Sequence, residues 1–212
     1  MLPFSRDQFF DVFARYNEAV WPTQLALTGA GVACAVAALL GRGGDRAISY
    51  VLAGLWAWMA VAYHFAFFAS INPAAWLFGC LFLVATALFA AYGTKSTLRF
   101  GGARGIRGVA GVGLVAYALI LYPVIGSVVG HAYPRTPTFG LPCPTTIFTL
   151  GMLLLARRPV PGALFIVPML WSAVGTFAAI ELGVTQDYGL PLAALVTAVL
   201  MIRRPIQARL SH

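Results

Sequence analysis

Long apolar runs, each ended by charged residues or by glycine and proline, constrain this chain more than any other feature of its sequence. A helix needs about 20 mostly apolar residues to cross the roughly 30 Å hydrocarbon core of a bilayer. The runs that approach or meet this length are residues 20–40, 49–70, 74–93, 108–130, 141–156, 160–181 and 188–202. They predict an all-α integral membrane bundle of about seven transmembrane helices. Six spans are the alternative, because the fifth and seventh runs are short.

The composition excludes the soluble classes of protein. Of the 212 residues, 60% are hydrophobic and 9% are charged, whereas a soluble domain carries about 25% charged residues. A chain of this size has too little interior to hide so much apolar surface from water. A secreted disulfide scaffold, a disordered chain and a cytosolic enzyme are therefore excluded. The net charge of +8 indicates membrane topology, and we expect no nucleic-acid partner.

The basic residues gather on one side of this seven-span topology. That side holds most of the lysines and arginines: Arg42, Arg46, Lys95, Arg99, Arg104, Arg107, Arg157, Arg158, Arg203, Arg204 and Arg209. Because loops rich in lysine and arginine stay in the cytoplasm, the amino terminus is predicted outside and the carboxyl terminus inside. Glu18, Glu181 and Asp187 fall on the outer side.

Three parts of the chain follow from this topology. Residues 1–18 are predicted to form an amphipathic helix in the membrane interface, begun by a capping box of Ser5 and Gln8. Its apolar residues recur at helical spacing: Phe9, Val12, Phe13 and Tyr16. Residues 19–203 form the seven-helix transmembrane domain, and residues 204–212 form a cytoplasmic tail.

Polar side chains in the spans concentrate in the outer half of the predicted bundle, where they usually face a cavity. Cysteine and histidine suit copper or zinc. We therefore expect an outward-facing polar cavity that binds, and conducts, a transition-metal ion or another small solute. The expected metal-binding residues are His64, His131 and Cys143, with Glu18 as their acidic partner. The expected supporting residues are Tyr63, Asn17, Asn72, Thr145 and Thr146.

A proline-rich segment precedes the fifth run. Prolines at positions 134, 137, 142 and 144 predict that no regular helix begins until after Pro144. We expect residues 142–144 to enter the membrane as irregular backbone that lines the cavity. The alternative is a stiff outer loop that only connects two helices.

Other uses of the same residues stay open. His64 and His131 are candidates to hold a haem, and Cys143 is a candidate nucleophile of a membrane-embedded enzyme with a histidine as its base. The chain is alternatively a non-catalytic subunit of a larger complex or of a homo-oligomer. A disulfide between Cys80 and Cys143 is a further possibility. ATP-driven transport by this chain alone is disfavoured, because the sequence has no glycine-rich phosphate loop with a lysine.

Three sequence segments resemble a family of bacterial multi-pass membrane proteins known only as a domain of unknown function. They are residues 16–22 (YNEAVWP), residues 63–75 (from YHF to INPAA) and residues 137–146 (PTFGLPCPTT). The resemblance covers nearly the whole chain. It implies a multi-pass protein of the bacterial inner membrane, and it implies no reaction.

Overall fold

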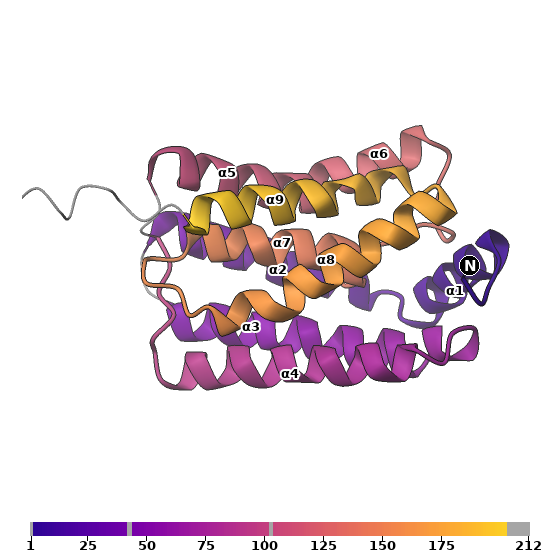
Figure 1. Cartoon of the computed structure of the whole chain (residues 1–212), viewed down its shortest axis with the longest axis horizontal. Coiled ribbons are helices and arrows are strands. Elements are labelled where there is room, and N and C mark those ends of the chain that lie inside the picture. Colours follow the sequence, from indigo (N-terminus) through magenta and orange to yellow (C-terminus); the bar gives the residue numbers. More distant parts are fainter. Residues whose placement is uncertain (1, 42–43, 102–103, 203–212) are drawn as a thin grey trace, which may run out of the picture.

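The computed structural model describes residues 2–41, 44–101 and 104–202, and within them the chain is helical and has no β-strand. The α-helices are α1 (Arg6–Ala19), α2 (Thr23–Leu40), α3 (Asp45–Trp58), α4 (Ala75–Thr94), α5 (Gly105–Ala116), α6 (Tyr122–Val128), α7 (Pro142–Leu155), α8 (Ala163–Leu182) and α9 (Gly189–Ile202). Two π-helical segments, η1 (Met59–Phe65) and η3 (Tyr117–Leu121), continue α3 and α5, and two 3₁₀ segments are η2 (Phe68–Ser70) and η4 (Thr185–Tyr188). Figure 1 shows the long helices packed side by side in one bundle.

Five helical segments of the described chain are long and apolar enough to cross a membrane. They are Thr23–Leu40, Asp45–Ser70, Ala75–Thr94, Gly105–Val128 and Ala163–Leu182. Helices α7 and α9 have 14 residues each, which is about 21 Å of helix at the usual rise per residue. The structure thus confirms an all-helical bundle with candidate membrane spans, while the count of seven spans and the orientation of the termini stay predictions.

Helix α7 forms the centre of the bundle. Every residue of α7 except Cys143 is buried, and a helix that is apolar all round belongs inside a protein. Helices α5, α8 and α9 pack around it. Because these neighbours shield its backbone, α7 can be shorter than a helix whose own surface faces lipid across the whole bilayer.

The expected irregular backbone at residues 142–144 is wrong. Helix α7 begins at Pro142, so that Cys143 and Pro144 lie in its first turn. Proline is tolerated in the first turn of a helix because the N–H group that it lacks would have no helical partner there. The consequence for the site is that Cys143 is held by the rigid start of the central helix.

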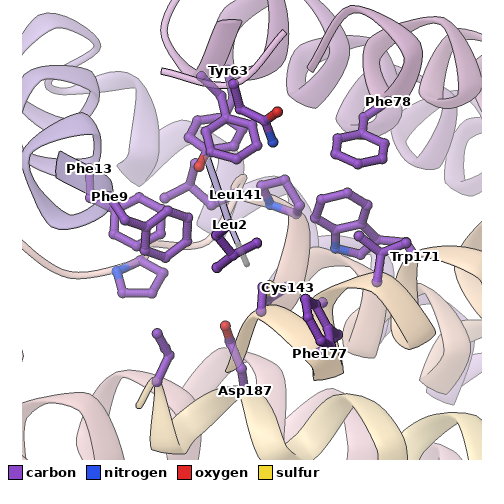
Figure 2. Close-up of a pocket in the computed structure, with 18 of the residues that line it drawn as sticks. Leu2, Phe9, Phe13, Tyr63, Phe78, Leu141, Cys143, Trp171, Phe177 and Asp187 are labelled. Carbon is purple, nitrogen blue, oxygen red and sulfur yellow. The ribbon is translucent and has the colours of Figure 1, made fainter. Parts of the chain in front are cut away.

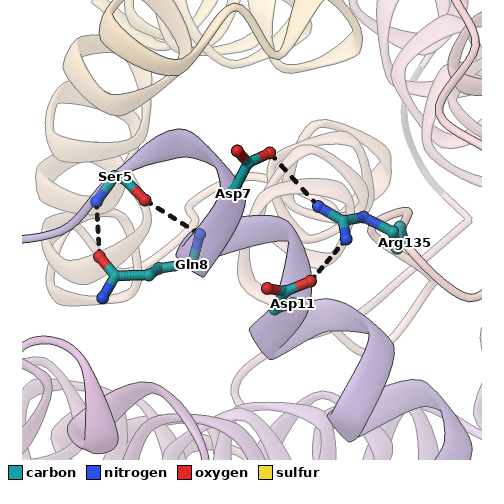
Figure 3. Close-up of polar contacts among 5 residues, drawn as sticks. All are labelled: Ser5, Asp7, Gln8, Asp11 and Arg135. Carbon is teal, nitrogen blue, oxygen red and sulfur yellow. Dashed lines mark hydrogen bonds and ion pairs between the residues drawn. The ribbon is translucent and has the colours of Figure 1, made fainter.

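Helix α1 begins with the predicted capping box, which is confirmed by reciprocal hydrogen bonds between Ser5 and Gln8 (Figure 3). The apolar face of α1 is buried and packs against the bundle. The residues of this contact include Phe9, Phe13 and Tyr16 from α1 and Tyr63, Phe68, Leu141 and Leu182 from the bundle. On its other face, Arg135 forms ion pairs with Asp7 and Asp11 (Figure 3). Helix α1 is therefore docked on protein along its apolar face.

The two ends of the bundle differ in character. Figure 1 shows α1 at the end opposite the α4–α5 and α7–α8 connections. Those connections carry Arg99, Arg104, Arg157 and Arg158. The end with α1 instead contains Asp187 and the segment from His131 to Leu141. The structure therefore separates an arginine-rich end from an end that is covered by a helix.

Candidate functional site

A cavity of about 90 Å³ lies beneath α1, between the start of α7 and the last part of α8. One water molecule needs about 10–15 Å³ by a comparable measure of volume, so the cavity can hold a group of several heavy atoms. We call it the aromatic chamber. Its walls are Leu2, Phe4, Phe9, Phe13, Tyr63, Phe68, Asn72, Phe78, Pro137, Leu141, Pro142, Cys143, Trp171, Val174, Gly175, Phe177, Ala178, Val184 and Asp187 (Figure 2).

Helix periodicity explains how α1 and α8 supply opposite walls of the aromatic chamber. Residues three and four positions apart share one face of a helix. On α8 this spacing joins Trp171, Val174, Gly175 and Ala178, and on α1 it joins Phe9 to Phe13. The Phe9 and Phe13 rings meet edge to face, with their centroids 4.5 Å apart. The chamber is therefore walled mainly by rigid aromatic and aliphatic groups.

Asp187 supplies a carboxyl group to the lining of the chamber. It lies in η4, is 3% exposed, and accepts a hydrogen bond from the hydroxyl of Tyr122. Burial raises the pKa of Asp187 from 3.8 to about 7, although its hydrogen bonds with Tyr122 and Cys143 favour the ionised form. The carboxyl group can therefore be neutral near neutral pH and then carry a proton to donate. Figure 2 shows Asp187 and Cys143 on the same side of the chamber.

His64 lies beside the chamber, behind one of its walls. It belongs to the π-helical segment η1 and is fully buried, and π-helical turns frequently occur at functional sites. Its ring centroid lies 4.7 Å from that of Phe82 and 5.3 Å from that of Trp171. Neither ring nitrogen has a hydrogen-bond partner among the described residues. Trp171 therefore contacts His64 with one part of its ring while another part lines the chamber.

The comparison with known families covers most of these elements. The sequence profile described as "Family of unknown function (DUF6064)" matches residues 6–212, which include α1, His64 and all of the chamber lining except Leu2 and Phe4. The chain belongs to this family. The membership confirms the resemblance drawn from the three sequence segments. No curated protein and no solved structure matches the chain.

The expected metal site of this DUF6064 protein is not supported. The described residues contain no group of three or more histidine, cysteine, aspartate or glutamate side chains placed to hold a metal ion. His131 Nδ1 lies 3.1 Å from Gln186 Oε1, and its ring packs on Phe10. Glu18 is exposed, whereas His64 is enclosed by aromatic rings. Of the expected ligands, only Cys143 lines the chamber. His64 and His131, the candidate haem ligands, thus have separate surroundings.

The expected supporting residues divide into two groups. Tyr63 and Asn72 line the chamber. The others lie elsewhere: Asn17 donates to the carbonyl groups of Pro134 and Thr136, and Thr145 accepts from the backbone N–H of Gly140. Thr146 is buried, and its hydroxyl has no hydrogen-bond partner among the described residues. Cys80 and Cys143 are both free, so the structure contains no disulfide between them.

Sequence reasoning missed the two most informative polar groups of the chamber. Asp187 stood in a predicted outer turn as one of several acidic residues, and nothing in the sequence marked it as buried. Trp171 stood within an apolar run. The available signal was the spacing of Trp171, Gly175 and Ala178, which places two small residues on the same helical face as a tryptophan and so leaves room beside it.

Proposed function

We propose that this chain is a seven-pass protein of the bacterial inner membrane, with its amino terminus outside, and that the aromatic chamber binds a small lipid-soluble molecule. The molecule reaches the chamber sideways from the outer leaflet of the bilayer. Binding pockets for small molecules are concave, mostly apolar and furnished with a few polar groups. The lining of the chamber has this composition, which supports the proposal.

The observation that carries the proposal is the exposure of the α8 wall. Val174 and Phe177 line the chamber, yet they are 39% and 53% exposed on the outside of the bundle. Helix α8 is one of the candidate membrane spans, so its outer surface faces lipid. Leu2 of the amino-terminal segment is partly exposed at the same chamber. These residues give the chamber a side that opens toward acyl chains, which favours a ligand delivered by the bilayer.

A membrane-embedded thiol enzyme is the second candidate function. One observation favours it: Cys143 is partly exposed to the chamber, at the start of α7 and in contact with Asp187. A thiol-directed activity probe should then label Cys143, and Cys143→Ser should abolish both the labelling and the reaction. Labelling that is no faster than that of the exposed Cys80 would remove this candidate.

Photolabelling in nanodiscs tests the binding proposal. A decyl diazirine partitions into lipid and reacts with whatever surrounds it. We expect labelling of Phe9 and Phe13, which lie on the buried face of α1, to saturate as the probe concentration rises. Labelling of the lipid-facing residue Val109, which is 73% exposed, should rise in proportion to the probe.

Two variants of α8 form a matched pair for this experiment. Ala178 lines the chamber, so Ala178→Phe should fill its open side and remove the saturable labelling. Ala173 is exposed on the same helix and is not part of the lining, so Ala173→Phe should leave the labelling unchanged. If Phe9 and Phe13 are labelled in proportion to Val109 in every variant, the chamber binds nothing and the proposal is wrong.

A further inference from the structure

The indole N–H of Trp171 differs from those of the other inward-facing tryptophans. Trp56 donates to the hydroxyl of Thr149, and Trp58 donates to the hydroxyl of Tyr16. Trp171 is only 6% exposed, and its Nε1 has no nitrogen or oxygen acceptor among the described residues. The acceptor beside it is the sulfur of Cys143, and a thiol sulfur accepts only weakly, whereas an indole nitrogen can only donate. Trp171 thus presents a donor with only a weak acceptor in the wall of the aromatic chamber.

Gly175 adds no side-chain atoms over this donor. A Cβ atom at position 175 would lie 3.5 Å from Trp171 Nε1 and 3.6 Å from Cys143 Sγ. Any side chain at this position would therefore cover both polar atoms. Figure 2 shows the indole nitrogen on the side of the Trp171 ring that faces Cys143. A molecule in the chamber can thus approach the indole N–H and the Cys143 side of the wall together.

Asp187 adds a second donor on the same side of the chamber. Its carboxyl group accepts a hydrogen bond from Tyr122 through Oδ1. Because burial raises the pKa of Asp187 to about 7, the neutral acid is available at neutral pH, and its O–H group can donate. None of the described lining residues is a lysine or an arginine, so an anionic head group would find no cation to pair with.

We propose that the polar side of the aromatic chamber recognises the carbonyl oxygen of a neutral, lipid-soluble molecule, with the Trp171 N–H and the Asp187 carboxyl group as donors. This inference rests on the proposed function and names the ligand class, which is ketones, esters or quinones with an apolar body. The aromatic walls hold the apolar body, and the two donors fix the position of the oxygen. A carbonyl oxygen suits this arrangement because it accepts two hydrogen bonds without carrying a charge.

Competition between two matched probes tests the inference. 2-Undecanone and undecane have the same chain length and differ only in the carbonyl group. Each is added to nanodiscs at a known concentration within the membrane, and the loss of decyl diazirine labelling at Phe9 and Phe13 is measured. One hydrogen bond adds about 0.5–1.5 kcal/mol, so the ketone should compete at a concentration about threefold to tenfold lower than undecane.

Two tryptophan variants identify the donor. Trp171→Phe keeps an aromatic ring but removes the N–H group, so it should reduce the advantage of the ketone to the share that the Asp187 donor contributes. Trp56→Phe removes an indole N–H that is bonded to Thr149 away from the chamber, so it should preserve the advantage of the ketone. Competition by undecane in each variant shows whether the chamber is still formed.

The outcomes separate this inference from the proposed function. Equal potency of the two probes in the wild-type protein overturns carbonyl recognition and leaves the binding of lipid-soluble molecules standing. An advantage of the ketone that is undiminished in Trp171→Phe overturns the role of Trp171. If neither probe reduces labelling in the wild-type protein, the inference and the proposed function both fail.

Discussion

The hydroxyl of Tyr122 on α6 donates a hydrogen bond to the carboxyl group of Asp187 in η4, 65 residues farther along the chain. Both side chains are buried. The bond ties the start of α6 to the turn between α8 and α9. It also fixes the carboxyl group that we assign to ligand recognition.

Removing the Tyr122 hydroxyl should destabilise the protein. Tyr122→Phe leaves a buried acceptor on Asp187 with one donor fewer, which costs about 1–3 kcal/mol of unfolding free energy. Tyr117→Phe is the matched control, because Tyr117 is partly exposed and its hydroxyl donates to the backbone carbonyl of Gln186 and not to a carboxyl group, so the loss of unfolding free energy should be smaller. Chemical unfolding in detergent micelles measures both variants. Equal losses of unfolding free energy in the two variants would show that the Tyr122–Asp187 hydrogen bond stabilises the protein no more than the Tyr117–Gln186 hydrogen bond does.

Asp187 should make the stability of the protein depend on pH. Its pKa is about 7 in the folded protein and 3.8 ordinarily, so the folded state retains a proton that the unfolded state loses between these values. Stability therefore falls as the pH rises from about 4 to about 7 and stays level above that range. A pKa shift of this size corresponds to a decrease in the free energy of unfolding on the order of 4 kcal/mol across this pH range.

The variant Asp187→Asn isolates this effect. Asparagine stays neutral, so the decline attributable to position 187 should disappear from unfolding curves recorded between pH 4 and pH 8. The titratable groups that face Asp187 are Tyr63, Tyr117, Tyr122 and Cys143, and His131 is linked to its neighbour Gln186. Subtracting the two pH curves cancels their contributions. Parallel curves for the wild type and Asp187→Asn would contradict the assignment.

Much of the fold could be predicted because lipid-crossing helices need long apolar runs, and such runs are local features of a sequence. The predicted run 160–181 and the helix α8, Ala163–Leu182, agree closely. The start of α7 could not be placed in this way. Proline forbids most helical positions but not the first turn, and only the packing of α7 at the centre of the bundle decides between the two cases.

The site was less accessible to prediction because it depends on contacts between distant segments. Polarity and predicted depth suggested that His64, His131, Cys143 and Glu18 share one cavity. Depth along the membrane normal does not say which way a side chain points around its helix, and Cys143 alone of the four lines the chamber. Likewise, the amphipathic pattern of α1 predicted an apolar face correctly. It could not show that this face packs on the bundle.

The docking of α1 should depend more on Asn17 than on Arg135. Asn17 is fully buried, and its Nδ2 lies 2.7 Å from the carbonyl oxygens of both Pro134 and Thr136. Asn17→Ala leaves these acceptors unpaired, at about 1–3 kcal/mol each, and should speed amide hydrogen exchange in α1 at least tenfold. The Arg135 ion pair with Asp11 is about half exposed, and such pairs contribute about 0–1 kcal/mol. Arg135→Ala should therefore speed exchange less than about fivefold. The reverse order would show that the ion pairs hold α1 in place.

Two glycines of α5, Gly111 and Gly113, differ in how closely they approach the central helix α7. A Cβ atom on Gly111 would lie 2.9 Å from the Leu155 side chain and 3.0 Å from the backbone oxygen of Gly151 on α7. Small residues allow such close approach of membrane helices, so Gly111→Ala must push α5 and α7 apart.

The expected loss for Gly111→Ala is about 1–3 kcal/mol of unfolding free energy. Gly113 lies two residues away on α5 with nothing within 4 Å of its Cβ position. Gly113→Ala should therefore stabilise the protein by up to about 1 kcal/mol, because alanine favours the helix more than glycine does. Thermal unfolding in the same detergent compares the two variants directly. Because both substitutions add one methyl group to the same helix, a fall in stability for both, or for Gly113→Ala alone, would mean that α5 does not pack on α7 through Gly111.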